Sequence, residues 1–219
     1  MLDQLEVYDD TEPRAAALNM AVDEALLEAA TSPALRFYRW RGPALSFGYF
    51  GSFADVSDQR AHREIVRRWT GGGVVPHGDD LTYSVVIPAG HSFFARSSLE
   101  IYSELHDAMR KALTANGVEA RLASSIAPKV SEDCFANAVR ADVLSEGRKI
   151  AGAAHRRSRA GLLHQGSIQL PRLPAKFTDD FAGALCDRFE RRTLSQELID
   201  RAATIAQAKY GTTDWLMRR

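Results

Sequence analysis

A run of three consecutive glycines between a basic segment and an apolar strand constrains the fold more than any other feature. The run is Gly71-Gly72-Gly73, preceded by Arg67-Arg68-Trp69-Thr70 and followed by Val74-Val75-Pro76-His77. Glycine has no Cβ, so another group can approach this backbone closely. Residues 81–87 then alternate with the period of a half-buried strand. The run therefore predicts a binding loop, and it fits neither a Walker A loop nor a Rossmann fingerprint.

Composition limits the possible binding partners and the cellular compartment. The 28 Lys and Arg residues balance the 28 Asp and Glu residues, so we expect no nucleic-acid partner. No segment approaches the ~20 apolar residues that span a bilayer, and the first ten residues lack the regions of a signal peptide. We expect a cytoplasmic protein without membrane association. Two cysteines do not form a disulfide framework in a chain of this length.

Periodicity and turn signals predict the elements. At 219 residues without a Pro/Gly/Ser-rich linker, the chain is expected to form a single domain, 1–219. We expect strands at 4–8, 35–40, 44–50, 65–68 and 81–87, and helices at 14–30, 55–63, 97–116, from Thr178 and from Ser195. Strand 4–8 is expected at a sheet edge, and 35–40 with 44–50 as a hairpin. Pro76 requires a bend or an edge position.

Several side chains on these elements have two interpretations. Asp23, Glu24 and His106 lie off the apolar faces of their helices, and we interpret them as solvated. Tyr49 and Phe50 are candidates for the wall of an apolar pocket, with packing in the core as the alternative. Cys186 is expected to be a half-buried structural thiol.

Residues 131–170 form the second informative region, which reads as a β meander from Ala141 onwards. In its strand 148–157, alternation places Lys149, Ala151, Ala153 and His155 on one face. Two small residues beside a lysine leave a furrow with an amine at its end. Such a furrow suits an extended acyl chain whose carbonyl lies near the amine.

Both regions resemble the signatures of the lipoate-protein ligase and octanoyltransferase family, which has a biotin/lipoate A/B ligase catalytic domain. The first resembles Arg-Arg-x-Thr/Ser-Gly-Gly-Gly followed by a His. In the second, residues 147–154 match Gly-Arg-Lys-Ile/Val-x-Gly-x-Ala, and residues 163–168 match a His-x-Gly-Ser/Thr strand. The resemblance covers roughly residues 4–170. It implies an α/β (α+β) fold with a mixed, largely antiparallel sheet flanked by helices.

The resemblance also implies site residues. Lys149 matches the lysine that contacts the carbonyl of the acyl group or the acyl-adenylate. The remaining acyl- or substrate-binding candidates are Arg67, Arg68, Thr70, Gly71, Gly72, Gly73, His77, Tyr83, Gly152, Ala153, His164 and Gly166. For His77, a hydrogen bond in the pocket and a structural place at the strand end remain open. We predict no metal ligand.

Three functions remain open, and a cysteine discriminates between the first two. In the octanoyltransferases a cysteine takes the acyl group from a thioester, and Cys134, fifteen residues before Lys149, resembles that cysteine. A nearby ammonium favours the thiolate, so Cys134 and Lys149 are predicted to form a catalytic dyad. The second function is an ATP-dependent lipoate ligase with a separate accessory subunit. The third is a non-catalytic lipoyl-binding relative.

Cofactors and partners follow from this choice. A transferase needs no cofactor, whereas a ligase needs ATP and Mg. The expected donor is an acyl carrier protein or the glycine cleavage H protein, and the acceptor is a lipoyl domain of the 2-oxoacid dehydrogenases. About fifty residues follow Leu170, so we expect no fused C-terminal accessory domain. Residues 140–159 hold six basic and two acidic residues, a local charge of +4 that suits an acidic donor or forms a plain solvated cluster.

Overall fold

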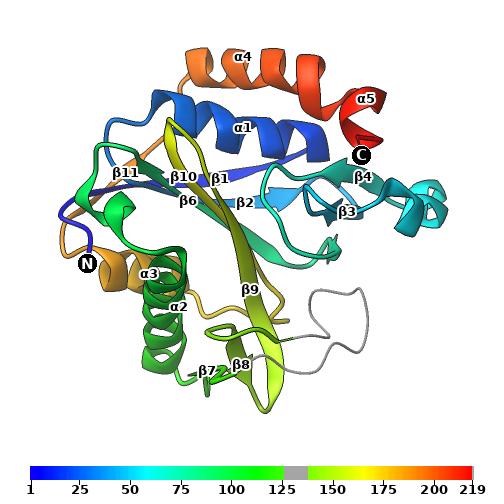
Figure 1. Cartoon of the computed structure of the whole chain (residues 1–219). Coiled ribbons are helices and arrows are strands. Elements are labelled where there is room, and N and C mark those ends of the chain that lie inside the picture. Colours follow the sequence, from blue (N-terminus) through cyan, green and yellow to red (C-terminus); the bar gives the residue numbers. More distant parts are fainter. Residues whose placement is uncertain (126–137, 219) are drawn as a thin grey trace.

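An eight-stranded sheet runs through the computed structural model, which describes residues 1–125 and 138–218 (Figure 1). Its strand order is β11-β1-β2-β6-β10-β9-β8-β7. The strands are β1 (Leu5–Arg14), β2 (Ala34–Trp40), β6 (Leu81–Pro88), β7 (Arg121–Leu122), β8 (Val143–Ser145), β9 (Arg148–Arg157), β10 (Gly161–Ile168) and β11 (Phe189–Arg192). β1 pairs in parallel with β2 and β11, and the other neighbours are antiparallel. The expected mixed, largely antiparallel sheet flanked by helices is confirmed.

A second sheet of three strands lies beside the large one, in the order β4-β3-β5 (Figure 1). Its strands are β3 (Ala44–Phe47), β4 (Glu64–Arg67) and β5 (Val75–His77). β5 contains Pro76 and, among the described residues, pairs with β3 alone, so the proline lies on an edge strand as predicted. The glycine run connects β4 to β5 and therefore joins two strands of this smaller sheet.

Helices cover both faces of the large sheet (Figure 1). α1 (Ala16–Ala29) lies on one face with α4 (Gln196–Ile205) outside it, and α2 (Ser98–Ala115) and α3 (Phe177–Leu185) cover the other. α5 (Thr213–Leu216) packs near β4. The remaining turns of helix are 3₁₀ at Phe53–Asp55, Ser57–Ala61 and Ser92–Ala95, and π at Ala206–Tyr210. Among the described residues, no helix is both long and apolar enough to cross a membrane.

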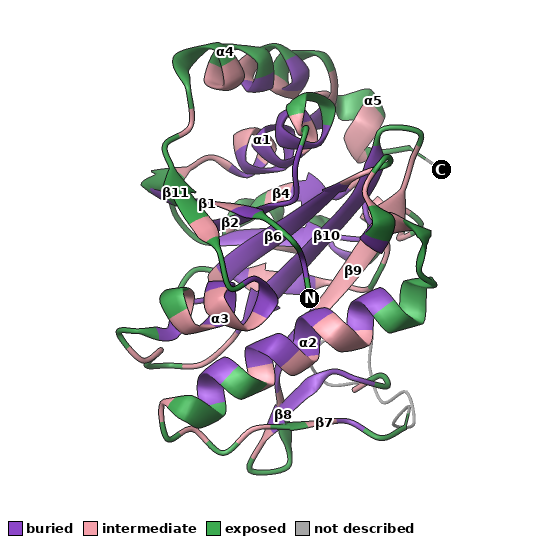
Figure 2. Ribbon diagram, turned by 90° about the vertical axis from the view of Figure 1, so that its left-hand side faces the viewer, coloured by how far each residue is buried: buried purple, intermediate pink, exposed green. Residues whose placement is uncertain are grey.

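The central strands are buried on both faces. On β6, Tyr83 and Val85 join the core under α2 and α3, whereas Val86 joins the cluster under α1. Figure 2 shows β6 and β10 buried along most of their length. The alternation predicted for residues 81–87 is confirmed, but residues 82–87 are buried on both faces because helices cover both sides of the sheet.

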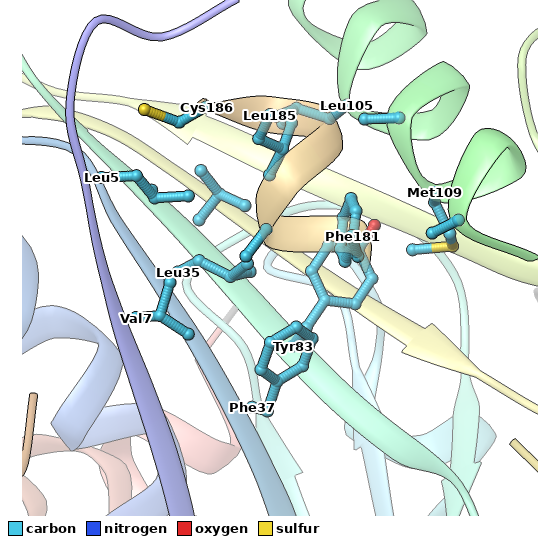
Figure 3. Close-up of a cluster of buried hydrophobic side chains, with 14 of the residues drawn as sticks. Leu5, Val7, Leu35, Phe37, Tyr83, Leu105, Met109, Phe181, Leu185 and Cys186 are labelled. Carbon is cyan, nitrogen blue, oxygen red and sulfur yellow. The ribbon is translucent and has the colours of Figure 1, made fainter. Parts of the chain in front are cut away.

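The core under α2 and α3 brings aromatic rings together. Phe37 of β2, Tyr83 of β6 and Phe181 of α3 meet in it (Figure 3). The Phe181 ring lies 5.5 Å from the Tyr83 ring and 6.1 Å from the Phe37 ring, within the range of favourable aromatic pairs. This packing fixes the side of the sheet to which Tyr83 belongs.

Two predictions about the N-terminal strands are wrong. β1 has ten residues and lies inside the sheet, where β2 and β11 both pair with it. β2 and β3 form no hairpin, since β2 pairs with β1 and β6 while β3 enters the smaller sheet. The turn signal at residues 41–43 indicates that the chain reverses there, but it gives no information on strand pairing. Both edges of β2 are occupied by other strands.

Of three polar residues expected in solvent, two are buried, and the third, Glu24, forms an ion pair with Lys209. Asp23 of α1 is fully buried and forms an ion pair with Arg36, with Nη1 and Oδ1 2.7 Å apart. His106 of α2 is also fully buried. α2 itself begins as predicted, because the Ser97 and Glu100 capping box is present. Each helix is packed over more of its circumference than its apolar stripe indicates.

Other boundaries differ in smaller ways. The helix expected at 55–63 is two short 3₁₀ turns, and β11 was not predicted. Thr178 does not cap α3, which begins after Lys176, whereas Ser195 caps α4 as expected. Cys186 follows α3 directly and is buried, with 1% of its surface exposed.

Candidate functional site

A narrow cavity lies between the two sheets and contains residues from both sequence motifs. It opens to solvent, and the space among its lining atoms, with the solvent at the mouth included, is about 420 Å³. β9, β10 and α1 form one side, and β3, β5 and the glycine loop form the other. The lining residues are Met20, Tyr38, Trp40, Ser46, Arg68, Gly72, Val75, His77, Thr82, Gly152, Ala153, Ala154, Gln165, Gly166 and Ser167.

The glycine loop is held in shape by the protein around it. The Arg68 guanidinium donates to the carbonyl oxygens of Gly71, at 3.0 Å, and Gly73, at 2.7 Å. Gly72 has a φ of 86° and faces Ala154 across the cavity, where a Cβ on Gly72 would lie 3.4 Å from the Ala154 Cβ. A Cβ on Gly48 would lie 2.0 Å from the Gly72 oxygen. The loop is therefore a preformed wall of the cavity.

His77 lies in a chain of buried hydrogen bonds along this wall. Its Nε2 is 2.7 Å from the Ser46 hydroxyl, and its Nδ1 is 2.8 Å from Asp80 Oδ2. Its ring also stacks on Trp40, with centroids 4.0 Å apart. Arg68 donates to the Ser46 oxygen, so the Ser46 hydrogen points to His77 Nε2 and the proton of His77 lies on Nδ1.

Burial and hydrogen bonds together determine the charges of His77 and Asp80. It lowers the pKa of His77 more than the bond to Asp80 raises it, so the ring is neutral at pH 7. Burial opposes ionisation of Asp80, but hydrogen bonds from His77, Ser167 and the Gly78 N–H outweigh it and lower the pKa of Asp80. A neutral imidazole thus bridges a serine and a carboxylate. The His77 ring lines the pocket, and the residue is also the last of strand β5. Neither of the two roles left open for His77 therefore describes it alone.

The connectivity of Ser46, His77 and Asp80 is that of a hydrolase triad, but its setting differs. Ser46 is fully buried, and its oxygen already accepts a hydrogen bond from Arg68. That bond engages one of the two lone pairs of the oxygen and makes the oxygen a weaker nucleophile. We therefore interpret these three hydrogen-bonded side chains as part of the cavity wall.

The other polar side chains of the wall are bonded to the protein as well. Thr82 accepts from the Trp40 indole at 2.7 Å and donates to Asp80 at 2.9 Å, and Ser167 donates to Asp80 at 2.7 Å. Gln165 accepts from Thr70 and donates to Asp23, at 2.8 and 2.7 Å. A wall whose polar groups bond to one another suits an alkyl chain, which offers no hydrogen bonds.

Lys149 lies beside Gly152, next to the cavity. The register between β8 and β9 shifts at Ile150, which forms a β-bulge. A Cβ on Gly152 would lie 2.3 Å from Lys149 Cε, so the lysine occupies the space that glycine leaves open. The predicted furrow of Lys149, Ala151, Ala153 and His155 is therefore wrong. Ala151 packs in the core under α2, and the bulge places Lys149 on the face of Gly152 instead.

The structure separates the predicted site residues into groups. It brings Arg68, Gly72, His77, Gly152, Ala153 and Gly166 to the cavity. Gly71 and Gly73 bond to Arg68 through their carbonyls, and Thr70 bonds to Gln165. Tyr83 and His164 lie on the opposite face of the sheet, where the Tyr83 oxygen is 3.1 Å from His164 Nε2. Cys134 lies outside the described residues.

Arg67 points away from the cavity. Its guanidinium donates to five backbone carbonyls, those of Tyr49, Gly51, Trp215, Leu216 and Arg218. Only 1% of the residue is exposed. Arg67 therefore joins the C-terminal segment to the loop after β3, and the structure gives it no contact with the cavity.

The expected basic cluster is divided. β9 spans about 30 Å at ~3.3 Å per residue, which separates Arg148 from Arg156 and Arg157. Arg157 donates to the Phe94 carbonyl at 2.6 Å, and the Arg156 guanidinium lies over the rings of Tyr49 and Trp69. The two ends of β9 therefore do not form one basic rim.

The aromatic residues proposed for the pocket wall also lie elsewhere. Phe50 is 88% exposed, and Tyr49 packs against Phe50 and Trp215. Met20, Tyr38 and Trp40 line the cavity in their place.

Sequence reasoning missed two buried acids that shape the site, Asp80 and Asp142. Asp142 is fully buried and pairs with Lys149, whose Nζ lies 2.8 Å from Oδ2. The available signal was its position in the apolar run Ala141-Asp142-Val143-Leu144, where a solvated acid is unusual. Asp80 gave a weaker signal, since it stands in a turn with Gly78 and Asp79.

Comparisons with known proteins place this geometry in context. Residues 15–181 match the family described as the lipoyl protein ligase A/B catalytic domain. The octanoyltransferase LipM of Oceanobacillus iheyensis is 38% identical over 202 residues, 88% of this chain and 73% of that protein. The octanoyltransferase LipM of Moorella thermoacetica is 31% identical, covering 92% of this chain and 93% of its own.

Solved structures share the fold. Protein Ta0514 from T. acidophilum, solved with bound lipoic acid, superposes with a TM-score of 0.76 at 21% identity, covering 99% of both chains. A lipoate-protein ligase A bound with ATP gives 0.74 at 21% identity, again over 99% of both chains. At these identities the likeness concerns the fold.

Proposed function

Because this chain belongs to the family of lipoyl protein ligase A/B catalytic domains, we propose that it is an octanoyltransferase of protein lipoylation. It moves an octanoyl or lipoyl group from the thioester of a carrier protein to a lysine of a lipoyl domain. The observation that carries the proposal is the similarity to two octanoyltransferases, 38% and 31% identical over most of the chain. This reaction needs no ATP.

The cavity supports an alkyl substrate. The small residues Gly72 and Ala154 face each other across it, and its polar side chains bond to one another. Each buried methylene of an acyl chain contributes about 0.8 kcal/mol to binding. When the acyl chain occupies the cavity, its carbonyl lies towards Lys149.

Cys134 carries the acyl group in the first half of the reaction, a role drawn from its sequence position. Its thiolate attacks the thioester carbonyl, a C–S bond to Cys134 forms, and the C–S bond to the carrier breaks. The charged Lys149 ammonium favours the Cys134 thiolate electrostatically, and N–H groups of the glycine loop stabilise the oxyanion. The thiolate that leaves with the carrier takes up a proton from this ammonium, which leaves Lys149 neutral.

The acceptor lysine completes the reaction. Its neutral amine attacks the acyl-Cys134 carbonyl, the amide bond forms and the C–S bond breaks, which returns the thiolate. The proton lost by the amine passes to a general base, and neutral Lys149 is the group that we assign to this step. The acceptor is a lipoyl domain, and the donor is an acyl carrier protein or the glycine cleavage H protein.

One experiment tests the function. The purified protein is mixed with octanoyl carrier protein and a lipoyl domain without ATP, and each species is weighed by intact-mass spectrometry. We expect the octanoyl mass to appear on the lipoyl domain, and on the enzyme as a thioester that hydroxylamine removes. Transfer that requires free acid and ATP would identify a ligase instead, and no transfer in either reaction would leave a lipoyl-binding protein.

The variant Cys134→Ser tests the route. We expect it to form no thioester and to lose transfer, whereas Cys186→Ala, at the buried second cysteine, keeps both. Full activity in Cys134→Ser without a trapped thioester would exclude the acyl-cysteine.

A further inference from the structure

A buried ion pair stands next to the cavity. Lys149 Nζ lies 2.8 Å from Asp142 Oδ2, and the two side chains are 3% and 0% exposed. Burying two charges costs free energy that only good geometry and further hydrogen bonds offset. Asp142 has those bonds, since the Tyr102 hydroxyl donates to Oδ1 and the Val139 N–H donates to Oδ2 at 2.7 Å.

Helix α2 holds Asp142 from the opposite side of the sheet. Tyr102 and His106 stand one turn apart on this helix. Tyr102 bonds to the carboxylate, and its oxygen accepts the Ala153 N–H at 3.1 Å, which ties Asp142 to the cavity strand. His106 Nδ1 donates to the Ala141 carbonyl at 2.7 Å. Two side chains of one helix therefore fix both Asp142 and the peptide before it.

The backbone before Asp142 is strained. Ala141 has a φ of 70°, in the left-handed region that costs a non-glycine residue about 1 kcal/mol. His106 Nδ1 holds this carbonyl as a donor. Burial lowers the pKa of His106 to about 4, so the ring is neutral and its Nε2 can accept the Tyr83 hydroxyl hydrogen at 3.1 Å. The strain is maintained by a network that ends at the Asp142–Lys149 pair.

The lysine is also constrained from the cavity side. The bulge at Ile150 turns Lys149 towards Gly152, and glycine leaves room for its Cε and Nζ. A side chain with four rotatable bonds keeps one position only when several contacts fix it. Among the described residues, Gly152, which leaves space for the side chain, and the carboxylate of Asp142 provide such contacts.

We propose that Asp142 is the positioning residue for Lys149: held by Tyr102 and His106 of α2, its carboxylate fixes the lysine amine beside Gly152, where the acyl carbonyl lies. The inference rests on the proposed function. Asp142 does not line the cavity, so it acts on the reaction through Lys149 and leaves binding of the acyl chain unchanged.

Kinetics of the full chain test this role. With octanoyl carrier protein and a lipoyl domain, we expect Asp142→Asn to lower kcat by about 100-fold with an unchanged KM, the scale of a small misplacement. In a Lys149→Met background, Asp142→Asn should cause no further loss, because its effect passes through the lysine. Tyr102→Phe should lower kcat less. Asp10→Asn, at a buried carboxylate paired with Arg36 elsewhere, is the matched control and should keep kcat.

A second measurement does not depend on activity. Lys149 is one of five lysines, so its acetylation by acetic anhydride can be followed by peptide mass spectrometry. We expect Lys149 to be acetylated faster in Asp142→Asn than in the wild type, and at the wild-type rate in Asp10→Asn. Wild-type kcat in Asp142→Asn, an added loss in the Lys149→Met background, or unchanged acetylation would each overturn the proposal. A wild type that transfers no octanoyl group without ATP would overturn the proposed function, while acetylation would still decide the role of Asp142.

Discussion

Gly152 is a single residue on which the geometry of the site depends, because its missing side chain makes room for another. The end of the Lys149 side chain occupies the place of a Cβ at this position. Gly166, on the neighbouring strand, makes room in the same way for the Tyr83 ring, 2.4 Å from where its Cβ would stand. Both glycines lie within strands, where glycine otherwise weakens the sheet.

Gly152→Ala is predicted to displace the Lys149 amine without closing the cavity. A shift of about 1 Å at a reacting group costs about 100-fold in rate, so we expect kcat of octanoyl transfer to fall on that scale. Gly42→Ala is the matched control, since nothing lies within 4 Å of its Cβ position. Steady-state assays of both variants make the comparison. Wild-type kcat in Gly152→Ala would mean that the lysine tolerates the displacement.

Residue identities in the two motifs were predictable, but the faces on which they lie were not. Lys149 and Gly152 were both singled out, yet period-2 counting assigned the lysine to the side of Ala151 and Ala153. A bulge adds one residue without a distinct sequence signal, so every assignment across it changes side. Asp142 escaped notice because its partner became visible only once the strands were paired.

At the scale of elements, Arg67 connects two segments that are distant in sequence. It donates to carbonyls after β3 and to carbonyls around α5, and the Trp215 indole donates back to the Arg67 carbonyl at 3.0 Å. Lys209 adds a second connection, with its Nζ 4.3 Å from the centre of the Trp69 ring. The C-terminal segment thus supports the strand from which the glycine loop leaves.

Arg67→Met is predicted to release that segment. Several buried carbonyls lose their donor, so we expect the free energy of unfolding to fall by about 3 kcal/mol. Hydrogen exchange should accelerate first at residues 213–218. Arg41→Met, at an exposed arginine, is the control and should leave both quantities unchanged. Unchanged exchange at 213–218 in Arg67→Met would show that α5 is held by its aromatic contacts alone.

Elements with local signals were predicted well, and their pairing was not. The capping box of α2 and the meander of β8, β9 and β10 are confirmed. Caps and tight turns depend on residues that are close in sequence, so the sequence predicts them well. The hairpin of β2 and β3 and the edge position of β1 are wrong. A strand's partners depend on competition among all strands, and β1 and β6 occupy both edges of β2.

At the scale of the whole molecule, buried histidines make stability depend on pH. Burial lowers the pKa of His77, His106, His155 and His164 below 6.5, with His106 at about 4. The unfolded chain therefore binds more protons than the folded one once pH falls below 6.5. Their contribution to stability is complete above that pH and declines as pH falls towards the folded-state values.

Urea unfolding between about pH 7.5 and about pH 5 measures this effect. Each histidine that titrates only in the unfolded chain contributes a slope of up to about 1.4 kcal/mol per pH unit. We expect His106→Gln to reduce the slope, and His62→Gln, at an exposed position, to leave it unchanged. A free energy of unfolding that stays constant down to pH 5 would contradict the neutral buried state of these rings.

The hydrogen-bonded wall of the cavity has a consequence for inhibitor design. A hydroxyl or amide placed on a compound along Ser46, His77 or Thr82 must separate two protein groups, at about 1–3 kcal/mol for each group left unpaired. A saturated tail avoids that loss. Tight compounds should therefore concentrate their heteroatoms at the Lys149 end and keep the remainder hydrocarbon.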